Sequence, residues 1–319
     1  MHPEPPMGRE AFWGNWALRM PDGAAGWLSL WEEQGQPDGE LWTVGSPKQL
    51  RKVHFQGETL LFERMLRIGP PEFPGGPPTG PRVACLHKAQ VAGAAMTIEL
   101  VTPATQTRPA SSTIFHGKRL PPLPPRPDLT RVRFGAPQRL FNGRNLDGWT
   151  LTNPAQINGW KAENGELVNA TPKLDFQPYS RYGNLRTIAE FTDFNLQIEF
   201  NVPAGGNSGI YLRGMYEAQV VDRDSRMQGI QGVGAIFGRI APSENAGLPG
   251  GNWQHYDLTL VQRHATVVLN GKKVIDNQPI AGCTNGALTA DETLPGPIYL
   301  QGDHTAVRYR NILLRPVVG

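Results

Sequence analysis

The chain has few charged residues and no cluster of one sign. Of its 319 residues only 18% are charged, and the formal net charge is +3. Lysine and arginine are dispersed, so the basic patch typical of a nucleic-acid-binding protein is not expected. No run of 18 apolar residues occurs, so the sequence contains no helix of the length and polarity needed to span a membrane.

Cysteine is almost absent as well. Cys85 and Cys283 stand in opposite halves of the chain, and no CxxC spacing typical of a metal site occurs. The two could pair only if the halves pack together, so two unpaired, small apolar residues are the simpler prediction. The first ten residues, MHPEPPMGRE, lack the apolar segment of a signal peptide.

Glycine and proline are abundant, and no long amphipathic pattern typical of a helix occurs. The chain has 37 glycines and 30 prolines, which favours many short strands joined by turns. Up to residue 120, eight runs alternate apolar and polar residues between turn signals, and we expect a small antiparallel β-barrel-like domain over 1–120. The proline-rich segment 121–138 is predicted to be a linker, followed by a second domain over 139–319.

Five tryptophans precede residue 45: Trp13, Trp16, Trp27, Trp31 and Trp42. They could fill the core of a small barrel or form a platform on which sugar rings stack. The sequence leaves both interpretations open, with core filling the simpler one.

The second half contains a stretch with an unusual polar pattern, GGNSGIYLRGMYEAQVVD, at 205–222. It reads as two strands joined by a Gly-Met turn. Side chains two apart on a strand share a face, so Asn207, Tyr211 and Arg213 are predicted on one face, and Glu217 with Gln219 on one face of the second strand. Such a polar floor suits a ligand rich in hydroxyls, although a solvated sheet face with ordinary cross-strand pairs remains an alternative.

Nine segments of the second half occur in a specific order. They are FNGRNLDGW, WKAENGELV, DFNLQIEF, GGNSGIYLR, YEAQVVD, AIFGRIAP, VVLNGKKV, LQGDH and YRNILLRP. Taken together, they resemble the 3-keto-disaccharide hydrolase domain family, over roughly residues 139 to 317. The resemblance implies an all-β fold, a concanavalin/laminin-G-like jelly-roll sandwich preceded by the smaller antiparallel barrel.

The resemblance also implies an enzyme, a hydrolase or lyase that acts on glycosides already oxidised at C3. A ketone at C3 makes the C2 proton acidic, so a base can remove it, the aglycone leaves from C1, and water adds to the enone. This route is an exception to the two-carboxylate scheme of glycosidases. It requires a general base, an acid for the leaving group, and groups that stabilise the enolate.

On this resemblance, the catalytic candidates are Glu217 and His304, as base and acid in either assignment, and Arg213 as a fixed charge near the developing oxyanion. The strand through Gln301 is expected to continue to His304 and bring it to the same face. Each candidate also has a non-catalytic explanation. Glu217 and Arg213 could form an ordinary cross-strand ion pair, and His304 could be a histidine in a surface turn.

Further residues are assigned to the substrate or to a metal. Asn207, Gln219 and Gln301 would hydrogen-bond sugar hydroxyls, Tyr211 could pack or donate, and Asp222, on the opposite parity, is retained as a second acid or ligand. A divalent metal, calcium or a transition metal, could be held by Glu217, Asp222 and His304.

Two other functions stay open at this stage. A lectin-like, non-catalytic carbohydrate-binding protein would use the same polar hairpin, because fold does not fix function. A conventional endo-glucanase is disfavoured because no E-x-D-x-x-E run is present. The expected partner is a small carbohydrate, and the family favours a periplasmic or extracellular location.

Overall fold

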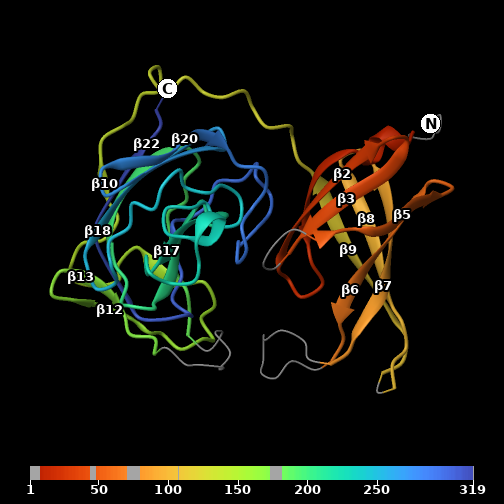
Figure 1. Ribbon diagram of the computed structural model, residues 1–319, viewed down its shortest axis with the longest axis horizontal. Coiled ribbons are helices and arrows are strands. Elements are labelled where there is room, and N and C mark those ends of the chain that lie inside the picture. The colour runs from red at the N-terminus through yellow and green to blue at the C-terminus, as the bar shows by residue number, and fades with distance from the viewer. Residues whose placement is uncertain (1–7, 44–47, 70–79, 107, 173–181, 319) are drawn as a thin grey trace. The chain divides into compact units, whose positions relative to one another are not determined.

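The computed structural model describes residues 8–43, 48–69, 80–106, 108–172 and 182–318. It divides the chain into two compact units, Met1–Pro122 with Leu288–Thr293, and Leu123–Ala287 with Leu294–Gly319 (Figure 1). Helical structure in the described residues is limited to short 3₁₀ turns, η1 (Arg9–Phe12) and η3 (Gly229–Gln231). The prediction of an all-β chain is therefore confirmed. The sequence Gly45-Ser46-Pro47 indicates a turn, and the glycine- and proline-rich segment 69–81 indicates a loop; the turn and most of the loop lie outside the described residues.

The first unit is one nine-stranded antiparallel sheet. In spatial order its strands are β4 (Lys48–Gln49), β3 (Gln36–Trp42), β2 (Ala25–Glu33), β1 (Gly14–Arg19), β9 (Ser111–Arg119), β8 (Ala95–Thr102), β7 (Arg82–Ala92), β6 (Thr59–Arg67) and β5 (Arg51–Gln56). The backbone N–H of Leu50, just before β5, donates to the carbonyl of Gly39 on β3 at 2.8 Å. The sheet is thus nearly closed, as expected for a small barrel.

Tryptophan fills space in this unit. Trp16, Trp27 and Trp42 are all buried, and Trp16 belongs to the barrel core together with Phe62 and Phe115. Burial of these large side chains is a major contribution to stability. Core filling, the simpler of the two interpretations, therefore accounts for these three side chains.

His87 of β7 is a buried titratable group in this core. Its ring stacks on Phe62 with 4.7 Å between ring centroids. Burial, together with the charge of Arg64, lowers the pKa of His87 to about 4, whereas an unfolded histidine titrates near ~6.5.

We expect the first unit to lose stability as the pH falls from about 6.5 to about 4, because the unfolded chain then binds a proton that the folded unit excludes. His87→Phe keeps the ring stack and should remove this acid sensitivity. Urea unfolding of both proteins at pH 7 and pH 5 measures it; an equal loss in the variant would contradict the assignment.

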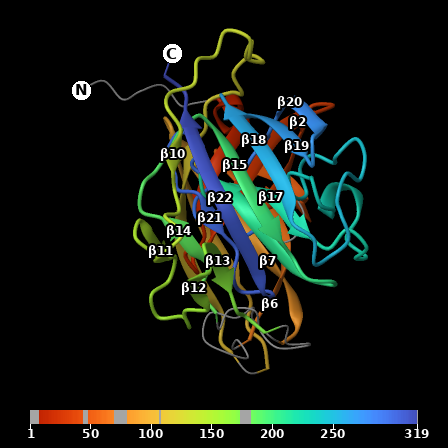
Figure 2. The same cartoon turned by 90° about the vertical axis from the view of Figure 1, so that its left-hand side faces the viewer.

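The second unit is a sandwich of two antiparallel sheets, as predicted. The larger sheet contains, in order, β12 (Trp160–Glu163), β13 (Glu166–Asn169), β22 (Val307–Pro316), β15 (Phe194–Asn201), β18 (Gln254–Val261), β19 (His264–Leu269) and β20 (Lys272–Pro279), with β10 (Gln138–Arg139) paired to β22. The smaller sheet contains β11 (Trp149–Leu151), β14 (Leu185–Thr187), β21 (Tyr299–Leu300), β16 (Asn207–Leu212) and β17 (Tyr216–Val221). Figure 2 shows β22, β15 and β18 side by side in the larger sheet.

Local sequence explains these elements. On β15 the buried residues alternate with half-buried ones, so one apolar face enters the core. Asn270 and Gly271, with φ of 51° and 80°, form the hairpin turn between β19 and β20, where both positions require positive φ. The hydroxyl oxygens of Ser208 on β16 and Tyr309 on β22 are 2.8 Å apart. Because β22 belongs to the larger sheet, the even-numbered residues of β16 face that sheet.

The proline-rich segment after the first unit is anchored to the second. The side-chain amide of Asn277 donates to the carbonyl of Pro127 at 2.8 Å, and Arg126 donates to the carbonyl of Asp276 at 3.0 Å. Residues 123–137 therefore belong to the second unit. Cys85 and Cys283 are both buried, and they do not form a disulfide. In the described part of the chain no helix has the length and apolar character required to cross a membrane.

Candidate active site

The hairpin of β16 and β17 presents a row of polar side chains on one face, as the alternation predicts. Tyr211 lies opposite Glu217, and Gly209 opposite Gln219. On the other side of β16, Tyr211 pairs with Tyr299 of β21, and their rings stack with 4.2 Å between centroids. Directly opposite residues share a face, so all five positions face away from the larger sheet.

Glu217 is the buried acid of this row. Its side chain is almost fully buried, and burial raises its pKa to about 8, with the nearby charge of Asp303 adding to the rise. Tyr211 lies 3.0 Å from Oε2 of Glu217 and 2.6 Å from the carbonyl oxygen of Asn285. Near neutral pH the carboxyl is therefore mostly protonated.

The hydroxyl of Tyr211 lies between two acceptors. It donates to the carbonyl oxygen of Asn285 and to Oε2 of Glu217. The second bond favours the ionised carboxylate, so it partly opposes the rise in the pKa of Glu217 that burial causes. A carboxylic acid that burial keeps neutral can donate a hydrogen bond or a proton.

Gly209 provides the space for that carboxyl. A Cβ built at Gly209 would lie 2.2 Å from Oε1 of Glu217 and 2.9 Å from its carboxyl carbon. The absence of a side chain at this position of β16 therefore fixes where the acid lies.

We expect Gly209→Ala to displace the Glu217 carboxyl. It should lower the rate of cleavage of a 3-keto-glycoside by about 10²-fold, the loss typical of a misplaced catalytic group. It should also destabilise the second unit. The shorter acid of Gly209→Ala/Glu217→Asp should recover part of that stability, as measured by urea unfolding. If Gly209→Ala has the stability and activity of the parent, the predicted clash between its Cβ and the Glu217 carboxyl has no consequence.

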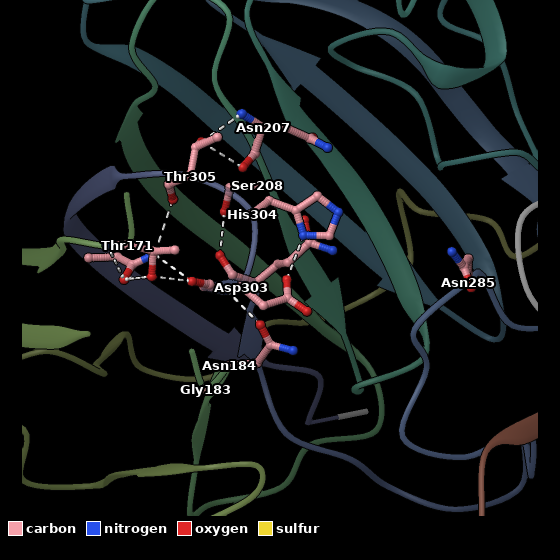
Figure 3. Close-up of polar contacts among 12 residues, drawn as sticks. Thr171, Gly183, Asn184, Asn207, Ser208, Asn285, Asp303, His304 and Thr305 are labelled. Atoms are coloured by element: carbon pink, nitrogen blue, oxygen red, sulfur yellow. Dashed lines mark hydrogen bonds and ion pairs between the residues drawn. The ribbon is translucent and has the colours of Figure 1, made fainter. Parts of the chain in front are cut away.

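A second acidic group lies on the loop after β21. The predicted strand to His304 was wrong, because β21 ends at Leu300 and the chain from 301 to 306 is a loop. On this loop Nδ1 of His304 lies 2.6 Å from Oδ1 of Asp303 (Figure 3). Both side chains are partly exposed, at 23% and 18%. The carboxylate of Asp303 orients the imidazole.

The Asp303 carboxylate of the Asp303–His304 pair interacts electrostatically with Glu217. The carboxylate of Asp303 contributes to the raised pKa values of Glu217 and Tyr299, after burial, the main cause in both. Glu217, Tyr211, Tyr299 and Asp303 therefore form one electrostatic group, with His304 attached to it.

Buried hydrogen bonds hold the loop in place. Asn169 and Thr171 donate to the carbonyl of Gly302 at 2.9 and 2.6 Å, and the backbone N–H of Gly302 donates to Asn184 at 2.7 Å (Figure 3). The hydroxyl of Thr305 exchanges hydrogen bonds with the backbone of Asn207. Such a network fixes the geometry of a site.

Three side-chain amide oxygens around the row have no hydrogen-bond partner within the described residues. They belong to Asn207, Gln219 and Gln301. The backbone N–H of Gln301 donates to the carbonyl of Gly209 at 2.9 Å, so Gln219 and Gln301 flank Gly209 on its two sides. A buried acceptor without a donor is costly, so these three oxygens are candidates to accept hydrogen bonds from a ligand.

Two other predicted residues lie elsewhere. β16 ends at Leu212, so Arg213 does not continue the strand; it has a φ of 56° and donates to the carbonyl of Leu294. Burial raises the pKa of Asp193, and the charge of Arg213 opposes that rise. A role of Arg213 at the oxyanion stays a prediction.

Asp222 follows the end of β17 and serves the backbone. It accepts hydrogen bonds from the N–H groups of Gly205 and Gly250 at 2.7 and 3.0 Å. The first of these is the main cause of its lowered pKa. Both carboxylate oxygens of Asp222 accept backbone hydrogen bonds, and a metal held by Glu217, Asp222 and His304 stays a prediction. Nowhere in the described chain are three or more His, Cys, Asp or Glu side chains grouped as metal ligands.

Sequence reasoning missed Asp303, Tyr299 and Asn184. Tyr299 had the same parity as Gln301, which was an available signal. Asn184 reaches the site only through the pairing of β14 with β21, which no local pattern predicts. It donates to the hydroxyl of Tyr299 at 2.9 Å.

Several solved structures that match part of the chain are described as glycosyl hydrolases or glucanases. A candidate glycosyl hydrolase from Parabacteroides distasonis shares 27% identity, over 62% of this chain and 94% of that chain, with a TM-score of 0.46. A second from the same organism shares 23% identity over 57% of this chain and 100% of its own, with a TM-score of 0.43. A prokaryotic β-1,3-1,4-glucanase (lichenase) derived from a mouse hindgut metagenome shares 9% identity over 53% and 93%, with a TM-score of 0.32.

No curated protein matches the chain. A family model does: the 3-keto-alpha-glucoside-1,2-lyase-like domain matches residues 136–315, more than half of the chain. This confirms the resemblance found in the sequence and supports a glycoside-hydrolase-like protein with a carbohydrate substrate. The chain belongs to the family of 3-keto-alpha-glucoside-1,2-lyase-like domains.

Proposed function

We propose that the second unit cleaves 3-keto-glycosides by elimination and hydration. The observation that carries the proposal is a buried carboxyl, Glu217, whose pKa is raised by burial and by the charge of Asp303, the residue that also contacts His304. Glu217 is buried and mostly protonated near neutral pH, while Asp303 orients His304 for use as a base. A carboxyl that burial keeps neutral can act as the acid, and an imidazole that a carboxylate orients can act as the base.

In the proposed reaction, Nε2 of His304 removes the proton from C2 of the 3-keto-sugar. The electrons of the C2–H bond pass into the C3 carbonyl and form an enolate. Glu217 protonates the glycosidic oxygen as the C1–O bond breaks, which leaves an enone and the free aglycone. Water then adds at C1, and C2 regains a proton. Tyr211 positions Glu217 through the hydrogen bond between them.

The amide oxygens define the substrate side of the site. Asn207, Gln219 and Gln301 are acceptors that lack donors in the described structure, and a neutral sugar ring has several hydroxyls to donate. Acceptors of this kind would select the hydroxylated ring and penalise a deoxy analogue, because a buried polar group would then stay unpaired.

The test uses a matched pair of substrates, a 3-keto-glucoside and the same glucoside without the ketone. We expect release of aglycone from the first only. Release from both would contradict a reaction that needs the C3 ketone. Binding of the keto-sugar without release would favour a lectin-like, non-catalytic role.

A further inference from the structure

The barrel of the first unit contains a polar group at one end of its interior. Arg64 on β6 lies opposite Cys85 on β7, and Phe62 lies opposite His87. Phe62 and Ala89 face the core, and residues two apart share a face. Arg64, Cys85 and His87 therefore point into the barrel and not to solvent.

Arg64 is a buried cation that has no carboxylate partner among the described residues. Its relative exposure is 9%, and its hydrogen bond is a long one, from Nη2 to the hydroxyl of Thr43 at 3.4 Å. The guanidinium carries five N–H donors, and no carboxylate of the described residues forms an ion pair with it. Leaving a buried charge unpaired is strongly unfavourable, so the site is suited to an anion.

His87 adds an unused acceptor beside it. Its Nδ1 lies 3.3 Å from the carbonyl of Cys85. A carbonyl only accepts, so Nδ1 carries the hydrogen and Nε2 is the acceptor. Nε2 is buried and has no hydrogen-bond partner in the part of the barrel that the structure describes. The stack on Phe62 fixes the ring, so a donor has to come to it.

We propose that this end of the barrel, around Arg64 and His87, binds a small oxyanion that also carries a hydroxyl. A planar guanidinium matches a carboxylate or phosphate group with two parallel hydrogen bonds, and the hydroxyl of the ligand would donate to Nε2 of His87. The site lies wholly within the first unit and is independent of sugar cleavage by the second.

Ligand-observed NMR on the full chain tests the proposal with acetate, glycolate and inorganic phosphate at constant ionic strength. Glycolate and acetate have the same charge, and only glycolate carries a hydroxyl. We expect saturation transfer to glycolate and competition between glycolate and phosphate for one site. Acetate should bind at least about threefold more weakly. The relative affinity of phosphate distinguishes a carboxylate ligand from a phosphate ligand.

Arg64→Met should weaken binding at least about tenfold and still fold, because replacing a buried charge by an apolar side chain of similar size is often tolerated. Arg51→Met, which removes an exposed arginine of the same unit, should bind like the parent. His87→Phe should remove the preference for glycolate over acetate. Absence of binding in the parent, or equal binding by the parent and Arg64→Met, would overturn the proposal. If Arg64→Met does not fold, Arg64→Lys provides the same comparison, because it keeps the charge and loses the paired donors.

Discussion

Replacing Glu217 by glutamine is expected to lower kcat on a 3-keto-glucoside by about 10³-fold, within the range for loss of a general acid. Glutamine keeps the size of the side chain and cannot transfer the proton. The parent enzyme should also lose activity as the pH rises through about 8, because burial raises the pKa of Glu217 to about 8 and the ionised form cannot act as the acid.

The rate of aglycone release between pH 5 and pH 10 measures both effects. If Glu217 were the base instead, the rate would rise through about pH 8. The profile therefore decides between the two assignments that the sequence left open.

The same carboxyl makes the second unit pH-sensitive in stability. The folded unit holds a proton up to about pH 8, whereas an unfolded glutamate releases it near ~4.3. As the pH rises from about 4.3 to about 8, the free energy of unfolding should therefore decrease, by at most about 1.4 kcal/mol per pH unit. Glu217→Gln should remove this decline in urea unfolding, and an unchanged decline would show that another group causes it.

Asp303→Asn is expected to lower kcat by about 10³- to 10⁴-fold, because an asparagine no longer holds His304 in the tautomer that a base requires. The loss of its charge should also lower the pKa of Glu217, since Asp303 contributes to the rise. The alkaline decline of the remaining activity should move to lower pH.

A matched control is available on the larger sheet. Asp257→Asn changes a carboxylate of β18 that accepts hydrogen bonds from Asn195 and Gln197, and it should leave kcat unchanged. The double variant His304→Ala/Asp303→Asn should be about as inactive as His304→Ala alone, because the two residues act as a unit. Fully additive losses would contradict a joint role.

Much of the fold could be predicted from the sequence, because alternation and turn residues are local signals. The strands of the first unit largely follow the alternating runs, although the turn signal Pro37-Asp38-Gly39 lies within β3 and not in a turn. The hairpin of β16 and β17 has the predicted faces, so Tyr211, Glu217 and Gln219 are brought together as expected.

The rest depends on contacts that no local pattern contains. Arg213 continues the alternation in the sequence, yet its positive φ turns the chain at the hairpin. Asp303 resembles an ordinary turn residue, and its role follows from the hydrogen bonds that fix the loop to Asn169, Thr171 and Asn184. The protonation of Glu217 results from burial, which a sequence does not show.

Hydrogen exchange at C2 tests the central claim most directly. The substrate analogue 3-keto-1,5-anhydroglucitol has no aglycone at C1, so only proton removal can occur. In D₂O the parent enzyme should introduce deuterium at C2 and not at C4, and His304→Ala should not. Absence of exchange at C2, with cleavage of the 3-keto-glucoside intact, would contradict elimination and favour direct displacement at C1.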